Sequence, residues 1–332
     1  MKSRARRSAS TVRARRLRAE IGPAAVPTHA VPRDAATPFL PYDIRPMQRE
    51  TIPAFDGRPL RVFHTERSTG RRNLMLVLPF GVRHAMVERL CNALEPHFNV
   101  ITWESRFVLD LQDDATDDAF DVEYHVRDLV TVAAHANDRV GHDGPIDVIG
   151  YCSGAGVGLL AAARYPDSVR RLALVCGEFM LKPSVCPPSS FQREVDVLLP
   201  VAATSKEMAG MLFDKISSGR SAPQSEFHSF ISVPFSSAAH LHRYGLNYIA
   251  YRRTDFLDEA ATVTQPTLVI ATRSDRQVLP ESARIIVAHL PDASGVYEFD
   301  GDHYELCRAQ PAMTDTLLQF FGTQANRSEP VQ

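Results

Sequence analysis

The chain has 332 residues, 44% of them hydrophobic and 23% charged, a length that allows one large core with an insert as well as two domains. No apolar run is long enough to span a membrane, because the longest, residues 148–163, is interrupted by glycines, so no membrane association is predicted. The five cysteines are scattered, form no Cys-x-x-Cys pair and follow no secretory hydrophobic segment, which predicts reduced thiols, a cytoplasmic protein and no zinc site.

The first residues differ in charge from the rest of the chain. Residues 1–20 contain eight basic residues and one acidic residue, a net +7, and because the whole chain carries −2, the remainder carries −9. A basic arm of this kind can bind nucleic acid or an anionic surface. Polar segments rich in Arg, Ala and Pro are more often disordered, so we expect residues 1–45 to form a disordered extension and predict no nucleic-acid partner.

From residue 51 onward the sequence alternates between strand and helix patterns. Residues 51–66 predict a hairpin around Asp56-Gly57, a dipeptide typical of tight turns between strands. Short apolar runs predict strands, and apolar residues three and four apart predict helices. In chain order we expect a strand at 73–79, a helix at 84–94, a strand at 98–104, a helix at 122–137, a strand at 145–150, a helix at 153–164 and a strand at 171–177.

After residue 180 this alternation is interrupted and later resumes. Residues 181–264 carry prolines, serines and irregular helical segments, which is typical of an inserted cap. The alternation predicts an α/β fold with a mostly parallel sheet flanked by helices on both faces, built from residues 46–180 and 265–325. The second part is expected to contain a strand at 266–273, a helix at 281–290, a strand at 295–300 and a helix at 305–321.

One motif in this core carries nucleophilic chemistry. Gly150-Tyr151-Cys152-Ser153-Gly154 fits the pattern glycine-x-nucleophile-x-glycine between a strand and a helix. The nucleophile in such a turn has a strained backbone, and the residues two positions away must be small so that strand and helix can approach each other. The glycine spacing centres on Cys152, with Ser153 as the alternative nucleophile.

With this motif and its flanks, the sequence resembles the α/β-hydrolase superfamily over residues 51–321. The resemblance implies an acid after a later strand and a histidine after the last strand. Asp275 and His303 follow the last two predicted strands in that order. Glu178, which follows the strand at 171–177, is a rival for the acid.

Other polar residues near these positions have less specific explanations. Asp300 and Asp302 are too close to His303 in sequence to orient it comfortably, so we interpret them as turn residues. His240 and His242 lie near three tyrosines, and they either line a substrate tunnel or complete the surface of the cap. The remaining histidines show no metal-ligand spacing, so neither a metal nor a cofactor is predicted.

The resemblance also implies a role for each site residue. His303 takes the proton of the Cys152 thiol and later protonates the leaving group, while Asp275 holds the imidazole in the required tautomer. The oxyanion needs two backbone donors. One is the N–H of Ser153, and the other comes from the loop after the strand at 73–79, where we expect Val82, with Phe80 as the second register.

A thiol in place of the usual serine selects for activated acyl donors. When a cysteine attacks a thioester, one thioester is exchanged for another, so the step is near thermoneutral and the acyl group stays activated. Attack on an ordinary ester or amide is uphill. Cys152 therefore favours an acyl thioester of an acyl carrier protein or of coenzyme A as the partner substrate.

Families with a cysteine at this turn include polyhydroxyalkanoate synthases, biosynthetic thioesterases and dienelactone hydrolases. The local resemblance is to the synthases in residues 99–106 and 148–154, but Ala155 replaces a usual glycine and no Trp stands near Asp275. We therefore expect a stand-alone biosynthetic thioesterase or acyltransferase rather than a polymerase. The alternatives are a carboxylic-ester or lactone hydrolase and a non-catalytic ligand-binding protein of the same fold.

Overall fold

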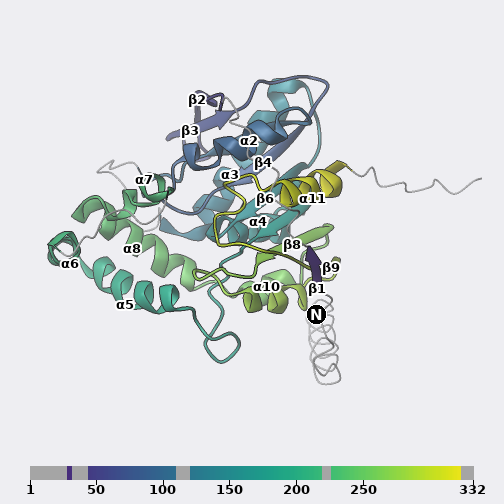
Figure 1. The fold of residues 1–332 in the computed structure, drawn as a ribbon. Coiled ribbons are helices and arrows are strands. Elements are labelled where there is room, and N and C mark those ends of the chain that lie inside the picture. Colours follow the sequence, from purple (N-terminus) through teal and green to yellow (C-terminus); the bar gives the residue numbers. More distant parts are fainter. Residues whose placement is uncertain (1–27, 32–43, 110–119, 219–225, 323–332) are drawn as a thin grey trace, which may run out of the picture.

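The computed structural model describes residues 28–31, 44–109, 120–218 and 226–322. Within them, one nine-stranded sheet has the order β1-β9-β8-β7-β6-β4-β5-β3-β2. Only the pairs β2–β3 and β3–β5 are antiparallel, which confirms the prediction of a mostly parallel sheet (Figure 1). The strands are β1 (Thr28–Val31), β2 (Gln48–Pro53), β3 (Pro59–His64), β4 (Arg72–Val77), β5 (Phe98–Trp103), β6 (Ile146–Tyr151), β7 (Val169–Val175), β8 (Thr267–Thr272) and β9 (Ala293–Phe299).

Helices cover both faces of this sheet. The central strand β6 is buried at all six positions, and its neighbouring residues Val148 and Ile149 belong to two different hydrophobic clusters, one on each face. One cluster includes residues of α3, α4 and α10, and the other includes residues of α2 and α11. The helices of the core are η1 (His84–Val87), α2 (Glu88–Leu94), α3 (Val122–Val140), α4 (Ser153–Arg164), η3 (Pro166–Ser168), α10 (Pro280–Val287) and α11 (Pro311–Gly322).

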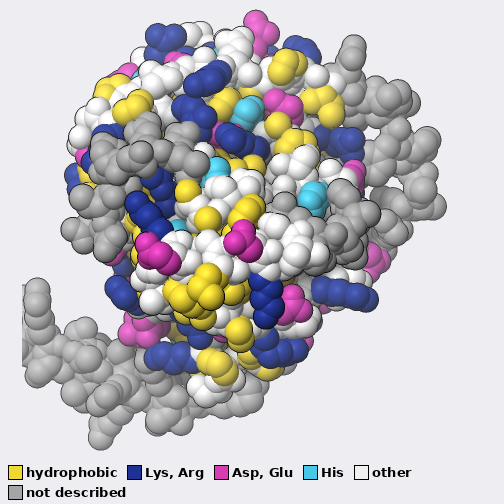
Figure 2. Space-filling model, turned by 90° about the vertical axis from the view of Figure 1, so that its left-hand side faces the viewer, with side chains coloured by type: hydrophobic (Ala, Val, Ile, Leu, Met, Phe, Trp, Pro, Cys, Tyr) yellow, Lys and Arg dark blue, Asp and Glu magenta, His cyan; other side chains and the backbone are white. Residues whose placement is uncertain are grey.

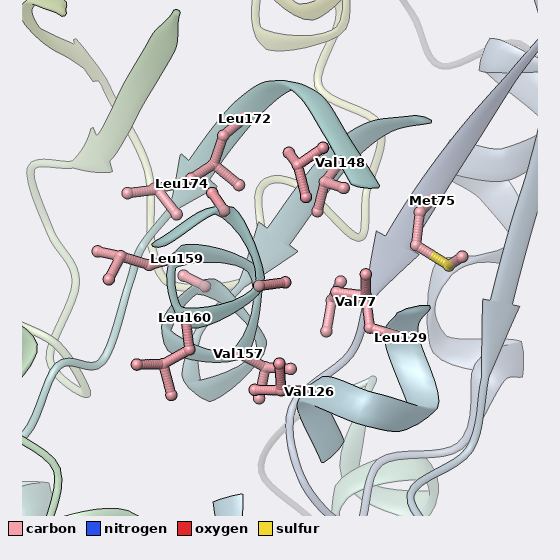
Figure 3. Close-up of a cluster of buried hydrophobic side chains, with 14 of the residues drawn as sticks. Met75, Val77, Val126, Leu129, Val148, Val157, Leu159, Leu160, Leu172 and Leu174 are labelled. Carbon is pink, nitrogen blue, oxygen red and sulfur yellow. The ribbon is translucent and has the colours of Figure 1, made fainter. Parts of the chain in front are cut away.

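Helix α4 packs directly on the middle of the sheet. Figure 3 shows Val157, Leu159 and Leu160 of α4 gathered with Val148 of β6 and Leu174 of β7. These five side chains are at most 1% exposed. This packing holds the beginning of α4 against the carboxyl end of β6, which is where the predicted nucleophile lies.

Most predicted elements occur within a few residues of their expected ends, but the last helix does not. It begins at Pro311 and not near residue 305, because residues 303–309 form turns and Ala309 has a left-handed φ of 52°. A proline is favoured in the first turn of a helix, where its missing N–H has no partner to lose. The turns leave residue 303 in a loop.

The range 1–45 contains one strand in its described part. Residues 28–31 form β1, which pairs in parallel with β9 and so covers one edge of the sheet. These four residues are therefore part of the sheet and not of a disordered extension. The basic residues 1–20 lie outside the described residues.

Between β7 and β8 the chain forms a layer of helices over one end of the sheet. They are α5 (Ser190–Thr204), α6 (Lys206–Ser218), α7 (His228–Ile231), η4 (Val233–Phe235), α8 (Ala238–Arg252) and α9 (Phe256–Ala260). They fall in the range predicted as an inserted cap, and α5, α6 and α8 share a small hydrophobic cluster. Gly245 allows α8 to approach α5, since a Cβ there would lie 2.7 Å from the carbonyl oxygen of Leu199.

The outer face of these helices is the left side of Figure 1 and faces the viewer in Figure 2. Small groups of hydrophobic side chains there alternate with Lys, Arg, Asp and Glu. Val197 of α5 and Met211 of α6 are 74% and 68% exposed. Across the described part of the chain, no helix combines the length and apolar character needed to cross a bilayer.

Candidate active site

Cys152 occupies the turn between β6 and α4 in a strained backbone conformation. Its φ is 53° and its ψ is −123°, a region that side-chain-bearing residues rarely adopt. A Cβ on Gly154 would lie 2.2 Å from the carbonyl oxygen of Val77, and one on Gly150 would lie 2.5 Å from the Cα of Ala155. The predicted need for glycine on both sides of the cysteine is thus explained by backbone contacts.

Asp275 and His303 meet at the same edge of the sheet. The Asp275 Oδ2 atom lies 2.7 Å from His303 Nδ1, and both side chains are buried. The Oδ1 atom accepts hydrogen bonds from the backbone N–H groups of Gln277 at 2.8 Å and Val278 at 2.9 Å. These two bonds fix the carboxylate, which in turn fixes the plane and tautomer of the imidazole.

The electrostatics of His303 couple it to Cys152. Burial opposes a charged imidazole, but the Cys152 sulfur and the Asp275 carboxylate outweigh burial and raise the pKa of His303 to about 10. A hydrogen bond between the Cys152 side chain and His303 contributes to the same shift. The site therefore favours an imidazolium that faces the sulfur. It brings Cys152, His303 and Asp275 together in the arrangement that the sequence predicted.

The two predicted oxyanion donors differ in their surroundings. The N–H of Ser153 lies in the first turn of α4, where it has no partner within the helix. The N–H of Val82 donates to the carbonyl oxygen of Pro79 at 3.2 Å, within a turn. The N–H of Phe80, the second register, donates to the Ser153 hydroxyl at 3.1 Å and so lies directly beside the turn of the cysteine. Both N–H groups thus have a partner in this structure, and the role of Val82, with Phe80 as the second register, stays a prediction.

The alternative residues have partners of their own. Asp300 pairs with Arg273, and Asp302 accepts hydrogen bonds from Arg308 and from the N–H of Tyr304, so both stabilise the loops around the site. Glu178 is buried, and the hydrogen bonds of its carboxylate go to the backbone N–H of Met180 and to the Gln192 side chain. Thus Asp275, and not Glu178, hydrogen-bonds the imidazole.

The histidines predicted as tunnel or surface residues make local contacts. His240 bonds to the hydroxyls of Ser236 and Ser237, and the Nδ1 of His242 donates to the carbonyl oxygen of Ala202. Neither is among the residues around the cavity described next.

A cavity of about 350 Å³ opens next to Cys152, beneath the cap helices. This volume lies near the lower end of the range of about 300–1,000 Å³ typical of small-ligand pockets. Side chains from the core loops, such as Phe80 and Val82, form one wall, and side chains from the cap, such as Val195 and Tyr248, form the other. Most of the lining is apolar. The polar or titratable residues of the lining, apart from the tyrosines, are Cys152, Ser153, Glu178, Gln192, His228, Ser232, Asn247, Gln277 and His303.

One residue near the site was not singled out from the sequence. The sulfur of Cys176, a carboxylate oxygen of Asp275 and a ring nitrogen of His303 all lie within 4.8 Å of one another. Three such donors can hold a metal ion, but burial keeps the pKa of Cys176 well above its ordinary value, and its thiol lies 3.5 Å from the Thr272 hydroxyl. Cys176 is therefore a neutral thiol close to the Asp275 carboxylate. The sequence did contain a signal for this proximity, because Cys176 directly follows β7 just as Cys152 directly follows the neighbouring strand β6.

Comparisons with known proteins agree with this fold. The family described as alpha/beta hydrolase fold matches residues 81–306. An L-allo-isoleucyltransferase of Pseudomonas savastanoi pv. glycinea is 24% identical over 266 residues, which cover 78% of this chain and 90% of that protein.

Solved structures of the same fold include an esterase from Exiguobacterium antarcticum, with 18% identity, a TM-score of 0.63 and coverage of 82% of this chain and 99% of the other. They also include an enol-lactonase from Burkholderia xenovorans, with 18% identity, a TM-score of 0.59 and coverage of 82% and 100%. At these identities the structures establish the fold alone.

Proposed function

Because the chain belongs to the α/β-hydrolase fold family, we propose that it transfers acyl groups from thioesters through an acyl-cysteine intermediate on Cys152. The observation that carries this proposal is the placement of the Cys152 thiol at the strained turn, opposite His303, which is held by Asp275. A binding protein needs no such arrangement. We therefore propose an enzyme and not a non-catalytic member of the family.

In the first half-reaction the acyl group moves to the protein. His303 takes the thiol proton, and the Cys152 thiolate attacks the carbonyl carbon of the substrate thioester. The carbonyl oxygen becomes an oxyanion that the N–H of Ser153 and a second N–H, from Phe80 or Val82, stabilise. The intermediate collapses when the carbon–sulfur bond to the leaving thiolate breaks, and the His303 imidazolium protonates that thiolate. The products are acyl-Cys152 and a free thiol.

In the second half-reaction an acceptor takes the acyl group. Neutral His303 removes a proton from an acceptor thiol, amine, alcohol or water, and the acceptor attacks the acyl carbon of acyl-Cys152. The bond between that carbon and the Cys152 sulfur then breaks, the product leaves, and the proton on His303 is shared with the regenerated thiolate. Because the intermediate is a thioester, transfer to another thiol is near thermoneutral and transfer to an amine is downhill. In the acyl-enzyme the Cys152 sulfur carries no charge, so one of the interactions that raise the pKa of His303 is absent, which favours the neutral imidazole that acts as a base.

The name of one relative and the energetics of the acyl-cysteine thioester both support transfer of an acyl group. The Pseudomonas savastanoi protein is named for the transfer of an L-allo-isoleucyl group, and it aligns along most of its own length with this chain. We propose that the donor is an acyl thioester of an acyl carrier protein or of coenzyme A. The second candidate is hydrolysis of activated esters or lactones, the type of reaction for which the esterase and the enol-lactonase of the same fold are named.

The test is an intact-mass experiment on four proteins: the wild type, Cys152→Ala, Ser153→Ala and a Cys176→Ala control. Each is mixed with a panel of acyl-pantetheine thioesters and quenched in acid. We expect a mass increase of one acyl group in the wild type, in Ser153→Ala and in Cys176→Ala, and none in Cys152→Ala. An adduct that persists in Cys152→Ala would rule out the proposed nucleophile.

The acceptor is identified with the isolated acyl-enzyme. Addition of a second thiol, such as pantetheine, is expected to discharge it faster than buffer does, with formation of a new thioester. Discharge to free acid at the same rate with and without the thiol would make hydrolysis the function.

A further inference from the structure

Glu178 is a buried carboxylate in the wall of the cavity that also contains Cys152. It is 7% exposed, and its backbone N–H donates to the carbonyl oxygen of Cys152 at 3.0 Å. The residue therefore follows β7 directly beside the turn of the nucleophile. The proposed mechanism gives it no role, because Asp275 holds the imidazole.

The hydrogen-bond partners of this carboxylate carry no charge. One oxygen accepts a hydrogen bond from the N–H of Met180 at 2.8 Å, and the other accepts one from the Gln192 side chain. Both donors are neutral, and no Lys or Arg lines the cavity among the residues that the structure describes. The positive charge that acts on Glu178 is that of His303, which is itself paired with Asp275. A carboxylate oxygen can accept more than one hydrogen bond, so each retains capacity for a ligand.

Burial of a carboxylate that has no ion-pair partner in contact is unfavourable. Loss of hydration raises the pKa of Glu178, and its two hydrogen bonds and the charge of His303 offset this only in part. A ligand that brings a positive charge into contact with Glu178 would remove this penalty and gain a charge-assisted hydrogen bond. The structure is thus suited to a cationic group close to the acyl-binding cysteine.

We infer that Glu178 binds the protonated α-amino group of the substrate, so that the acyl group carried by Cys152 is an α-aminoacyl group. This inference rests on the proposed acyl-cysteine function. In such a group the nitrogen is attached to the carbon next to the reacting carbonyl, close to the sulfur of Cys152. The backbone bond between Glu178 and Cys152 keeps the two residues at a fixed spacing.

The rest of the cavity specifies the side chain of that amino acid. Val82, Met86, Val195, Ile231 and Phe235 contribute apolar surface to its lining. A charged or strongly polar side chain would lose hydration there without gaining a partner. The cavity therefore fits an amino acid with an apolar side chain.

Glu178 also connects the core to the cap through Gln192, so its substitution could act through structure alone. The experiment separates the two roles with paired substrates. L-isoleucyl-pantetheine thioester and its des-amino analogue, 3-methylpentanoyl-pantetheine thioester, differ only in the ammonium group. The initial rate of acylation of Cys152 is measured for each by acid quench and intact mass at pH 7.

For the wild type we expect faster acylation by the aminoacyl thioester than by the analogue. In Glu178→Gln, which keeps the shape and the bond from the N–H of Met180 but places an NH₂ group opposite the Gln192 donor, we expect the aminoacyl rate to fall by about 10- to 100-fold, the range for loss of a hydrogen bond to a charged group. The rate with the analogue should change by less than about 3-fold, within the range of a minor perturbation. Glu194→Gln, the same change at an exposed carboxylate of α5 that does not line the cavity, is the matched control and should change neither rate.

The possible outcomes are distinct. Equal slowing of both substrates in Glu178→Gln would assign Glu178 a purely structural role and overturn the inference. Acylation of the wild type by the analogue but not by the aminoacyl thioester would also overturn it, while the proposed function stands. No adduct from any thioester would instead reject the proposed function.

A second measurement needs no variant at Glu178. N-acetyl-L-isoleucyl-pantetheine thioester retains the side chain and lacks the positive charge. We expect the wild type to react with it at least about 10-fold more slowly than with the free aminoacyl thioester, for the same reason. Equal rates for the two would contradict an ammonium site even if Glu178→Gln failed to fold.

Discussion

The cysteine turn illustrates how single residues determine this site. Cys152 adopts a left-handed φ because the contacts of Gly150 and Gly154 force the chain to bend sharply between strand and helix. This exposes the cysteine to the cavity while its neighbours on both sides are buried. Asp275 fixes His303 through one oxygen and is itself fixed through the other. Because the two carboxylate oxygens have different partners, replacement of the carboxylate by an amide has a predictable effect.

Asp275→Asn should slow acylation of Cys152 by on the order of 10²- to 10⁴-fold. The asparagine oxygen can replace Oδ1 in the bonds to Gln277 and Val278, which directs its NH₂ group at His303 Nδ1. That nitrogen must then accept a hydrogen bond and carry no proton, so the other ring nitrogen carries the proton and cannot take that of the thiol. Single-turnover rates of adduct formation measure the effect. A rate near that of the wild type would show that Asp275 does not set the tautomer.

At the scale of elements, several buried polar contacts join the core to the cap. His125 of α3 lies 2.6 Å from the Asn247 side chain of α8, measured from Nε2 to Oδ1, and its ring packs on that of Phe80. Tyr251 of α8 adds hydrogen bonds to the carbonyl oxygens of Ser153 and Glu178. The helix that covers the cavity is therefore tied to the turn of the nucleophile by polar contacts as well as by packing.

The imidazole of His125 makes stability depend on pH. Burial lowers the pKa of His125 from 6.5 to about 4, so below pH 6.5 the unfolded chain binds a proton that the folded protein does not. The stability that neutral His125 contributes is therefore fully present above pH 6.5 and is lost as the pH falls towards 4. Between pH 7.5 and 5 the wild type should lose about 2 kcal/mol more stability than His125→Gln, which carries no titratable ring. Urea denaturation at both pH values tests this, and identical losses in the two proteins would contradict it.

At the scale of the whole molecule, the position of each cysteine relative to the sheet determines whether its thiol is accessible. Cys91, Cys176, Cys186 and Cys307 are buried, while Cys152, at the carboxyl edge of the sheet, is partly exposed. Burial raises the pKa of each of the four buried thiols. Parallel strands place their carboxyl ends at one edge, and only the cysteine in the sharp turn at that edge reaches the cavity.

Alkylation should therefore distinguish one thiol from the other four. With iodoacetamide at neutral pH we expect a single fast adduct on the native protein, and no fast adduct on Cys152→Ala. Protein unfolded in guanidinium should take up five adducts in the wild type and four in the variant. Comparable rates for several thiols in the native wild type would show that Cys152 is not selectively activated.

The sequence by itself determined the fold class, because apolar strands that alternate with amphipathic helices can bury their surfaces only in a parallel sheet covered on both faces. It also determined where Cys152, Asp275 and His303 lie, since each follows a strand and parallel strands bring such loops together. It did not predict the end of the last loop, because the left-handed φ of Ala309 depends on the packing around it.

Contacts between distant residues were decided by the tertiary structure alone. No local pattern shows that Phe80 N–H would reach Ser153, or that Thr28–Val31 would pair with β9, since both depend on segments far apart in the chain. The same holds for the choice between the two acids. Asp275 and Glu178 both follow strands, and only the three-dimensional arrangement places Asp275 on the imidazole and leaves Glu178 in the wall of the cavity.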